Sequence, residues 1–104
     1  MKIRVGVIMI AVLATTAATT GFAQGAETYK AKCQMCHGAS GMADSPAGKA
    51  MKVKPITDPD VKKLTEAEMI KATNNGMGKM QPFKGKLTEA QIKDAVVYFR
   101  TFLK

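Results

Sequence analysis

The stretch KCQMCHG, residues 32–38, limits how the rest of this chain can fold. If it is helical, Cys33 and Cys36 stand three positions apart and Cys33 and His37 four, so both thiols and the imidazole project from one face. Such a cluster suits three kinds of chemistry: a redox-active dithiol, a metal site, or the covalent attachment of a flat cofactor. The remaining sequence distinguishes between them.

Two of these alternatives find little support elsewhere in the chain. A thioredoxin-like dithiol belongs in a βαβ setting, but no segment alternates apolar and polar residues with period two, so we expect no strands. A closed zinc site takes four ligands, whereas His37 is the sole histidine and there are only two cysteines. A structural disulfide between Cys33 and Cys36 would close a very small loop and constrain the unfolded chain little.

Covalent haem explains the same three residues. Two thiols can add to the two vinyl groups at the edge of a haem while the adjacent imidazole reaches the iron, which is the chemistry of the C-x-x-C-H pattern. A domain this small often needs a cofactor to complete its core, and a buried porphyrin would contribute roughly 25 cal/mol per Å² of apolar surface. We therefore expect one haem c, bound through Cys33 and Cys36, with His37 as an iron ligand.

The N-terminus has the pattern of a secretory signal peptide. Lys2 and Arg4 precede an apolar run over residues 5–14, and a small-residue segment closes on Ala23. We predict cleavage after Ala23, with Ala26 as the alternative site. The apolar run is shorter than the ~20 residues that span a bilayer, although a retained N-terminal anchor is the other interpretation.

The predicted division is a signal peptide at residues 1–23 and one domain at residues 24–104. The whole chain carries a net charge of +8, and removing two of its sixteen basic residues with the signal peptide leaves +6. A basic balance also occurs in nucleic-acid-binding proteins, but the lysines are spread along the chain and export removes the protein from most nucleic acid. We expect no nucleic-acid partner.

The N-terminal half of the domain predicts one helix and one long loop. Residues 26–36 place Ala26, Tyr29 and Cys33 on one helical face. Residues 38–60 are rich in Gly, Ser, Asp and Pro, with one helical turn expected at residues 48–53. Long loops in small domains are usually functional, and this one is suited to wrap a ligand.

Two further helices begin with the same device. Thr65 with Glu68, and Thr88 with Gln91, are capping boxes. The first of these helices should end in a left-handed cap near residues 74–76, and the second should continue to the C-terminus. Its apolar stripe consists of Ile92, Val96, Phe99 and Leu103.

A second axial ligand must come from a residue other than histidine, and methionine suits a high reduction potential. Beyond residue 23 the methionines are Met35, Met42, Met51, Met69, Met77 and Met80. Met35 lies inside the attachment turn, which we define as residues 33–37. Met69 has a core position. Met42 and Met51 lie in the long loop, on the proximal side of the haem. We favour Met80, with Met77 as the alternative, and an open or water-filled sixth position as the third interpretation.

The segments AETYKAKCQMCHG (residues 26–38) and GKMQPFKGKLTEAQIKDAVVYFRTFLK (residues 78–104) resemble the attachment helix, ligand loop and terminal helix of small class I c-type cytochromes with one haem. The resemblance covers nearly the whole domain. It implies an all-α small cytochrome c fold, with three to four helices wrapped around one covalent haem.

The resemblance also assigns residues. It implies thioether bonds from Cys33 and Cys36, His37 as the proximal ligand and Met80 as the distal ligand, so that these are the cofactor-binding residues and the last two bind iron. It further implies that Gly25 and Tyr29 lie where the first helix crosses the last, with Tyr98 resting on the glycine. Many family members hold the proximal imidazole through a proline carbonyl, for which Pro46 and Pro55 are both candidates.

The implied function is a soluble periplasmic electron carrier and not an enzyme, because an iron with six ligands exchanges electrons without binding a substrate. The alternative is a haem-based sensor or small peroxidase in which the distal Met80 is labile. We expect a monomer without stable membrane insertion after signal cleavage. Its redox partners should have acidic docking surfaces, steered by Lys79, Lys84 and Lys86.

Overall fold

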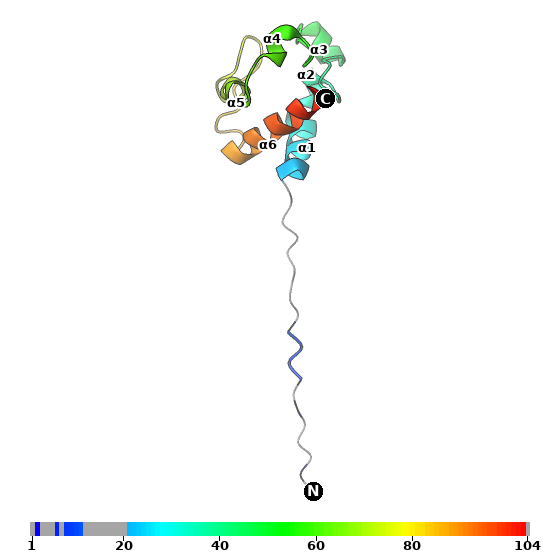
Figure 1. Cartoon of the computed structure of the whole chain (residues 1–104), viewed down its shortest axis with the longest axis vertical. Coiled ribbons are helices and arrows are strands. Elements are labelled where there is room, and N and C mark those ends of the chain that lie inside the picture. The colour runs from blue at the N-terminus through cyan, green and yellow to red at the C-terminus, as the bar shows by residue number, and fades with distance from the viewer. Residues whose placement is uncertain (1, 3–5, 7, 12–20, 104) are drawn as a thin grey trace.

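The structure, a computed structural model, describes residues 2, 6, 8–11 and 21–103. Most of the predicted signal peptide therefore lies outside the described residues. Residues 21–103 form six α-helices and a terminal 3-10 turn (Figure 1): α1 (Gly21–Lys32), α2 (Gln34–His37), α3 (Pro46–Ala50), α4 (Pro59–Lys62), α5 (Glu66–Asn75), α6 (Glu89–Arg100) and the turn Thr101–Leu103. The described part of the chain contains no strand, only two isolated bridges. The all-α prediction is confirmed.

The most extensive helix–helix contact joins α1 and α6, which cross near the bottom of the domain in Figure 1. At the crossing, a Cβ on Gly25 would lie 2.2 Å from the carbonyl oxygen of Asp94 and 3.2 Å from Cβ of Tyr98. Only glycine allows two backbones to approach so closely. The roles expected for Gly25 and Tyr98 are confirmed.

Both predicted capping boxes are present. The Thr65 hydroxyl accepts from the backbone N–H of Glu68, whose carboxylate accepts from the N–H of Thr65 at 2.7 Å. Thr88 and Gln91 make the same pair of bonds at the start of α6. These bonds satisfy N–H groups that a helix end leaves without partners, which fixes where α5 and α6 begin.

The predicted helix over residues 26–36 differs from the structure at both ends. Helix α1 begins earlier, at Gly21, and the ring of Phe22 lies 5.4 Å from that of Tyr98. The helix is also interrupted at Cys33, whose backbone angles of φ −115° and ψ −37° separate α1 from α2. Because the Cys33 N–H still bonds to the Tyr29 carbonyl at 2.8 Å, the interruption is a local kink.

The segment of residues 38–60, expected to be a loop with one helical turn, contains α3 and the start of α4. Ser45 caps α3 through the N–H of Gly48, and Asp58 caps α4 through the N–H of Asp60. The helical turn expected at residues 48–53 therefore lies slightly earlier, because proline is favoured at the first position of a helix. The expected three to four helices are accompanied by such single-turn helices.

The core consists of buried apolar side chains from all parts of the domain. The most deeply buried are Tyr29, Ile56 and Ile92, at 2%, 0% and 1% exposed. Among the described residues, no helix is long and apolar enough to cross a membrane.

Candidate functional site

Two hydrogen bonds, each from a side-chain hydroxyl to a backbone carbonyl, hold the attachment turn in place. The Tyr29 hydroxyl donates to the carbonyl of Gly38 at 2.5 Å, and the Ser45 hydroxyl donates to the carbonyl of Met35 at 2.5 Å. Helix α3 packs so closely on this turn that a Cβ on Gly48 would lie 2.3 Å from the Cys36 carbonyl oxygen. The positions of both cysteines and of His37 are therefore set by contacts from α1 and α3.

His37 presents a neutral, unpaired imidazole. Burial lowers its pKa below the ordinary value, so the ring is uncharged at neutral pH. Its Nδ1 is fully buried and bonds to no described residue, including Pro46 and Pro55, the two candidates for holding it. The Phe99 ring packs edge-on against the imidazole with centroids 5.1 Å apart. A neutral imidazole is the form that binds metal ions.

The two cysteines are half-buried and form no disulfide with each other. Burial, with a smaller effect from Cys36, raises the pKa of Cys33 to about 11. Redox-active dithiols have a depressed thiol pKa, so this environment disfavours the dithiol interpretation. No group of three or more His, Cys, Asp or Glu side chains among the described residues has an arrangement that could hold a metal ion.

An apolar cavity of about 110 Å³ lies beside the attachment turn and opens to the surface. The lining residues come from α1, α2, α4, α5, α6 and the loop after α5: Tyr29, Cys33, His37, Val61, Met69, Ala72, Thr73, Met80, Ala95, Val96 and Phe99. Cys36 is not part of this lining, and its Sγ lies 3.9 Å from Sδ of Met51.

The cavity brings Met80 together with Cys33 and His37, from which it is far apart in the sequence. Met77, the alternative ligand, is 61% exposed and does not line the cavity. Met69 does line it, but the Arg100 guanidinium donates to its sulfur at 3.7 Å and to the Leu64 carbonyl at 2.8 Å. Of the two methionines in the lining, Met80 is thus the one whose sulfur has no hydrogen-bond donor among the described residues.

Sequence analysis did not identify Thr73 and Arg100 as residues of this site. The buried Thr73 hydroxyl donates to the Met69 carbonyl at 2.8 Å, on the cavity side of α5. Polarity gives no signal for either residue, because threonine and arginine are common on exposed helix faces. The spacing of four residues from Met69, which places Thr73 on the same face of α5, is the signal that could have found the threonine.

Comparisons with known proteins identify the family of this chain. A cytochrome c6 from Leptolyngbya boryana is 36% identical over 76 residues, which are 73% of this chain and 86% of that protein. The solved structure of the KustC0563 c-type cytochrome matches with a TM-score of 0.67 and 30% identity, covering 75% of this chain and 95% of that one. Residues 20–99 match the family described as cytochrome c oxidase, cbb3-type, subunit III.

The chain belongs to the class I c-type cytochromes. It is a monohaem electron carrier, with c-type haem bound covalently through Cys33 and Cys36. The observed residues fit this cofactor, since the apolar cavity is lined by Cys33, by the Met80 thioether and by His37, whose Nδ1 has no hydrogen-bond partner among the described residues.

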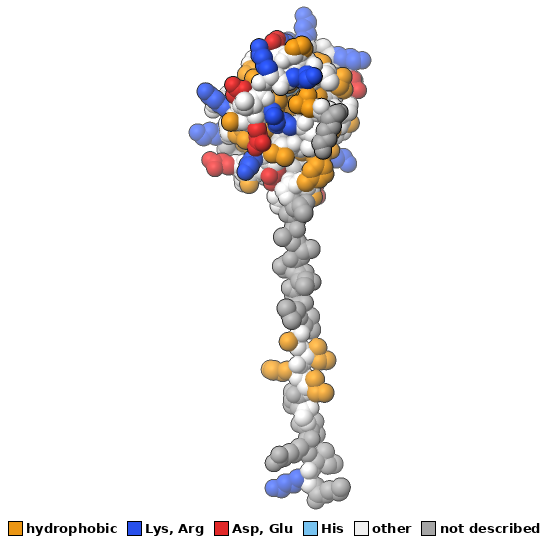
Figure 2. Space-filling model, viewed as in Figure 1, with side chains coloured by type: hydrophobic (Ala, Val, Ile, Leu, Met, Phe, Trp, Pro, Cys, Tyr) orange, Lys and Arg blue, Asp and Glu red, His pale blue; other side chains and the backbone are white. Residues whose placement is uncertain are grey.

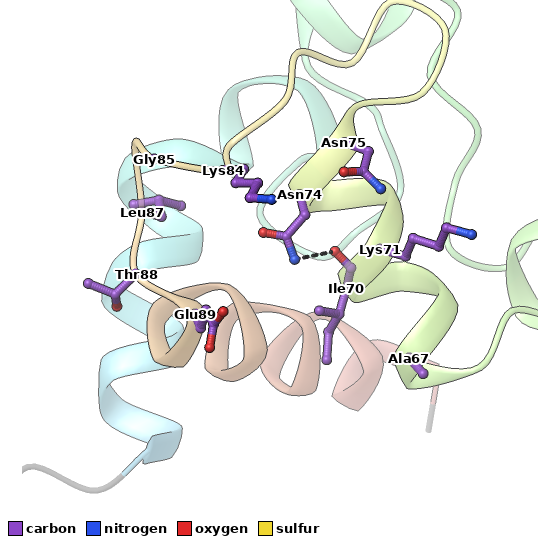
Figure 3. A pocket seen from close by; sticks show the side chains of 10 residues that line it. All are labelled: Ala67, Ile70, Lys71, Asn74, Asn75, Lys84, Gly85, Leu87, Thr88 and Glu89. Atoms are coloured by element: carbon purple, nitrogen blue, oxygen red, sulfur yellow. Dashed lines mark hydrogen bonds between the residues drawn. The ribbon is translucent and has the colours of Figure 1, made fainter.

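A second hollow of this cytochrome lies on the opposite face of α5 (Figure 3). Its walls are the outer side of α5 and the chain that leads into α6: Ala67, Ile70, Lys71, Asn74, Asn75, Lys84, Gly85, Leu87, Thr88 and Glu89. The Asn74 amide donates to the carbonyl of Ile70 at 3.2 Å. The lining of this hollow combines apolar side chains with charges of both signs, and α5 separates it from the apolar cavity.

Proposed function

We propose that this cytochrome is an exported one-electron carrier whose iron is held by His37 and Met80. The observation that carries this proposal is that the two side chains line one apolar cavity beside Cys33. When bound, haem supplies the exchange between Fe(III) and Fe(II). An iron with both axial positions filled has no open site for a substrate, which favours electron transfer over substrate chemistry.

The protein's own residues determine how readily that exchange occurs. Burial keeps His37 neutral, and the thioether of Met80 is a soft, neutral ligand that favours the reduced state. The apolar lining excludes water and lowers the local dielectric, which also disfavours the more highly charged ferric form. Together these groups predict a relatively high reduction potential.

Substitution of Met80 tests the ligand assignment. The protein is matured in a host that attaches haem, and a pyridine haemochrome spectrum first verifies two thioether bonds. Met80→Ala should abolish the weak red absorption band of methionine-ligated ferric haem, lower the reduction potential and open the iron to cyanide. Met77→Ala is the matched control, because Met77 is exposed outside the cavity.

The outcomes separate the possible ligand sets. Loss of the band in Met77→Ala but not in Met80→Ala would move the assignment to Met77. Rapid cyanide and carbon monoxide binding by the wild type would instead indicate a labile sixth ligand, as in a sensor or small peroxidase.

We further propose that residues 1–23 direct export to the periplasm and are removed after Ala23. Cleavage there retains Gly25, which the crossing of α1 and α6 needs, whereas cleavage after Ala26 would remove it. N-terminal sequencing of the exported protein should begin at Gln24. A sequence beginning at Met1 would contradict processing, and one beginning at Glu27 would contradict the site.

We also propose that acidic redox proteins dock on the side of the loop of residues 76–88, which carries Met80. Lys79, Lys84 and Lys86 are exposed there, and Lys84 also borders the hollow beside α5. Basic side chains outnumber acidic ones over the visible face of the domain (Figure 2). Such a field accelerates association with an oppositely charged partner in a salt-dependent way.

Charge reversal tests this docking face. Lys79→Glu, Lys84→Glu and Lys86→Glu should each slow the bimolecular electron-transfer rate with an acidic redox protein at low ionic strength, and the loss should shrink as salt is added. Lys49→Glu, at an exposed position on α3, is the control with the same change in net charge. An equal effect from all four variants would indicate net charge alone and would contradict a docking face.

A further inference from the structure

We propose that Gly76 is the positioning residue for Met80. Because it has no side chain, the segment of residues 77–80 can close against the end of α5, and this closure sets how far Met80 reaches into the cavity. The inference rests on the proposed function, in which Met80 binds iron.

Residues 77–80 form a hairpin that behaves as one unit. The Met77 N–H donates to the Met80 carbonyl at 3.1 Å, and the Met80 N–H donates to the Met77 carbonyl at 2.9 Å. Gly78, the first of the two central residues, has φ +56°, and Lys79 does not have positive φ, a combination typical of type II′ turns. Because the two bonds are reciprocal, a displacement of Met77 is transmitted to Met80.

The chain beyond the hairpin is tied to the last turn of α5. The Phe83 N–H donates to the Thr73 carbonyl at 2.9 Å, and the Lys84 N–H donates to the Asn74 carbonyl at 3.2 Å. Phe83 is itself only 7% exposed. These bonds use carbonyls that a helix C-terminus leaves without partners, so both ends of the segment that carries Met80 are fixed.

Gly76 lies where this closed segment meets the helix end. Its backbone angles of φ +78° and ψ 163° fall in a region that is essentially restricted to glycine. A left-handed cap was expected here, and the structure has the positive φ but an extended ψ. A Cβ on this residue would lie 2.8 Å from the Met80 carbonyl oxygen and 3.1 Å from the Pro82 nitrogen.

Both of these neighbours are backbone atoms, which cannot rotate away as a flexible side chain can. A methyl group at position 76 therefore has to push the hairpin outward or distort the end of α5. Either change moves the Cα of Met80 relative to His37, on which the Met80–iron bond depends.

Two other glycines allow the effect of this contact to be distinguished from the effect of a positive φ. Gly78 and Gly85 have φ +56° and +83°, yet a Cβ on either would have no atom within 4 Å. Alanine at Gly85 should thus impose backbone strain without displacing Met80. Gly85→Ala is the control for Gly76→Ala and is matched to it in φ.

The experiment compares the haem-loaded wild type, Gly76→Ala and Gly85→Ala. The readouts are the red methionine–iron band, the reduction potential, the rate of cyanide binding to the ferric protein, and thermal unfolding. We expect Gly76→Ala to weaken the band, lower the potential and bind cyanide about tenfold faster, which corresponds to about 1.4 kcal/mol. Gly85→Ala should lose stability but keep the wild-type band and cyanide rate.

A second variant approaches the same contact from its other side. Pro82 is exposed, so Pro82→Ala leaves no core cavity, yet it removes the ring that packs over Gly76. Pro82→Ala should bind cyanide a few times faster than the wild type. If Gly76→Ala yields no haem-loaded protein, Pro82→Ala alone tests whether this contact positions Met80.

The results distinguish a failure of this inference from a failure of the proposed function, in which Met80 binds iron. The positioning role alone would be overturned if Met80→Ala loses the band while the variants at Gly76 and Pro82 keep it. These variants would then also bind cyanide at the wild-type rate. Equal effects of Gly76→Ala and Gly85→Ala would also overturn it, because stability would then be the cause. A band that survives in Met80→Ala would instead refute the ligand assignment.

Discussion

Substitution of Gly25 by alanine tests the contact on which the fold depends most. A Cβ at this position would lie 2.2 Å from the carbonyl oxygen of Asp94 on α6, whereas ordinary carbon–oxygen contacts begin at about 3.3 Å. The Asp94 carbonyl belongs to the helix backbone and cannot turn aside. Helix α1 must therefore move about 1 Å away from α6 to accept the methyl group.

The cost can be estimated from that displacement. A gap of about 0.5–1 Å forfeits a quarter to a half of the dispersion attraction across an interface, and overpacking typically costs about 1–3 kcal/mol, occasionally more. Alanine regains up to about 1 kcal/mol because it favours the helix more than glycine does. Because the α1–α6 interface is the most extensive in the domain, we expect a net loss of about 2 kcal/mol.

The assay is thermal unfolding of the haem-loaded protein, followed by far-UV circular dichroism. For a domain of this size, the expected loss lowers Tm by about 10 °C. The control is Ala31→Gly at an exposed position of α1, which reports helix propensity alone and should cost about 1 kcal/mol. A Gly25→Ala protein as stable as the wild type, or more stable, would refute the argument that backbone contact requires glycine.

Two further predictions follow from hydrogen bonds. Tyr29→Phe should destabilise the domain by about 1 kcal/mol in chemical denaturation, near the low end for a lost buried hydrogen bond, because the Gly41 N–H also reaches the Gly38 carbonyl at 3.3 Å. Hydrogen bonding, chiefly from Lys54 at 3.0 Å, lowers the pKa of Asp60. This exposed carboxylate thus contributes a small stabilisation above its unfolded-state pKa of about 3.9 that is lost as the pH falls through the lower folded-state value. Asp60→Asn should reduce the acid dependence of the unfolding free energy, and an unchanged dependence would contradict it.

The parts of the fold that the sequence predicts are those determined by neighbouring residues. The starts of α5 and α6 are predictable because a capping box needs only a threonine and a residue three positions later. The starts of α3 and α4 have a local signal too, in Ser45-Pro46 and Asp58-Pro59, which periodicity overlooks. In the uncleaved chain the start of α1 at Gly21 is different, because the ring of Phe22 packs against Tyr98 on another helix, and no local pattern records that contact.

The same distinction applies to the site. The spacing of Cys33, Cys36 and His37 is local, and the haem attachment that it predicts agrees with the family to which the chain belongs. That Met80 rather than Met77 lines the cavity depends on the hairpin bonds and on the closure at Gly76. The distances that determine this closure join residues four and six positions apart across a turn, which helical periodicity does not describe.

The cavity also explains how three long helices make a stable core in so short a chain. Helices α1 and α5 both pack on α6, but among the described residues they share no comparable interface with each other. They face one another across the apolar cavity, to which α1 contributes Tyr29 and α5 contributes Met69 and Ala72. Since protein interiors are close-packed, an apolar hollow that opens to the surface is not a stable substitute for an interface. Haem bound through Cys33 and Cys36 therefore takes the place of the missing α1–α5 contact, and the group that carries the electron also completes the core.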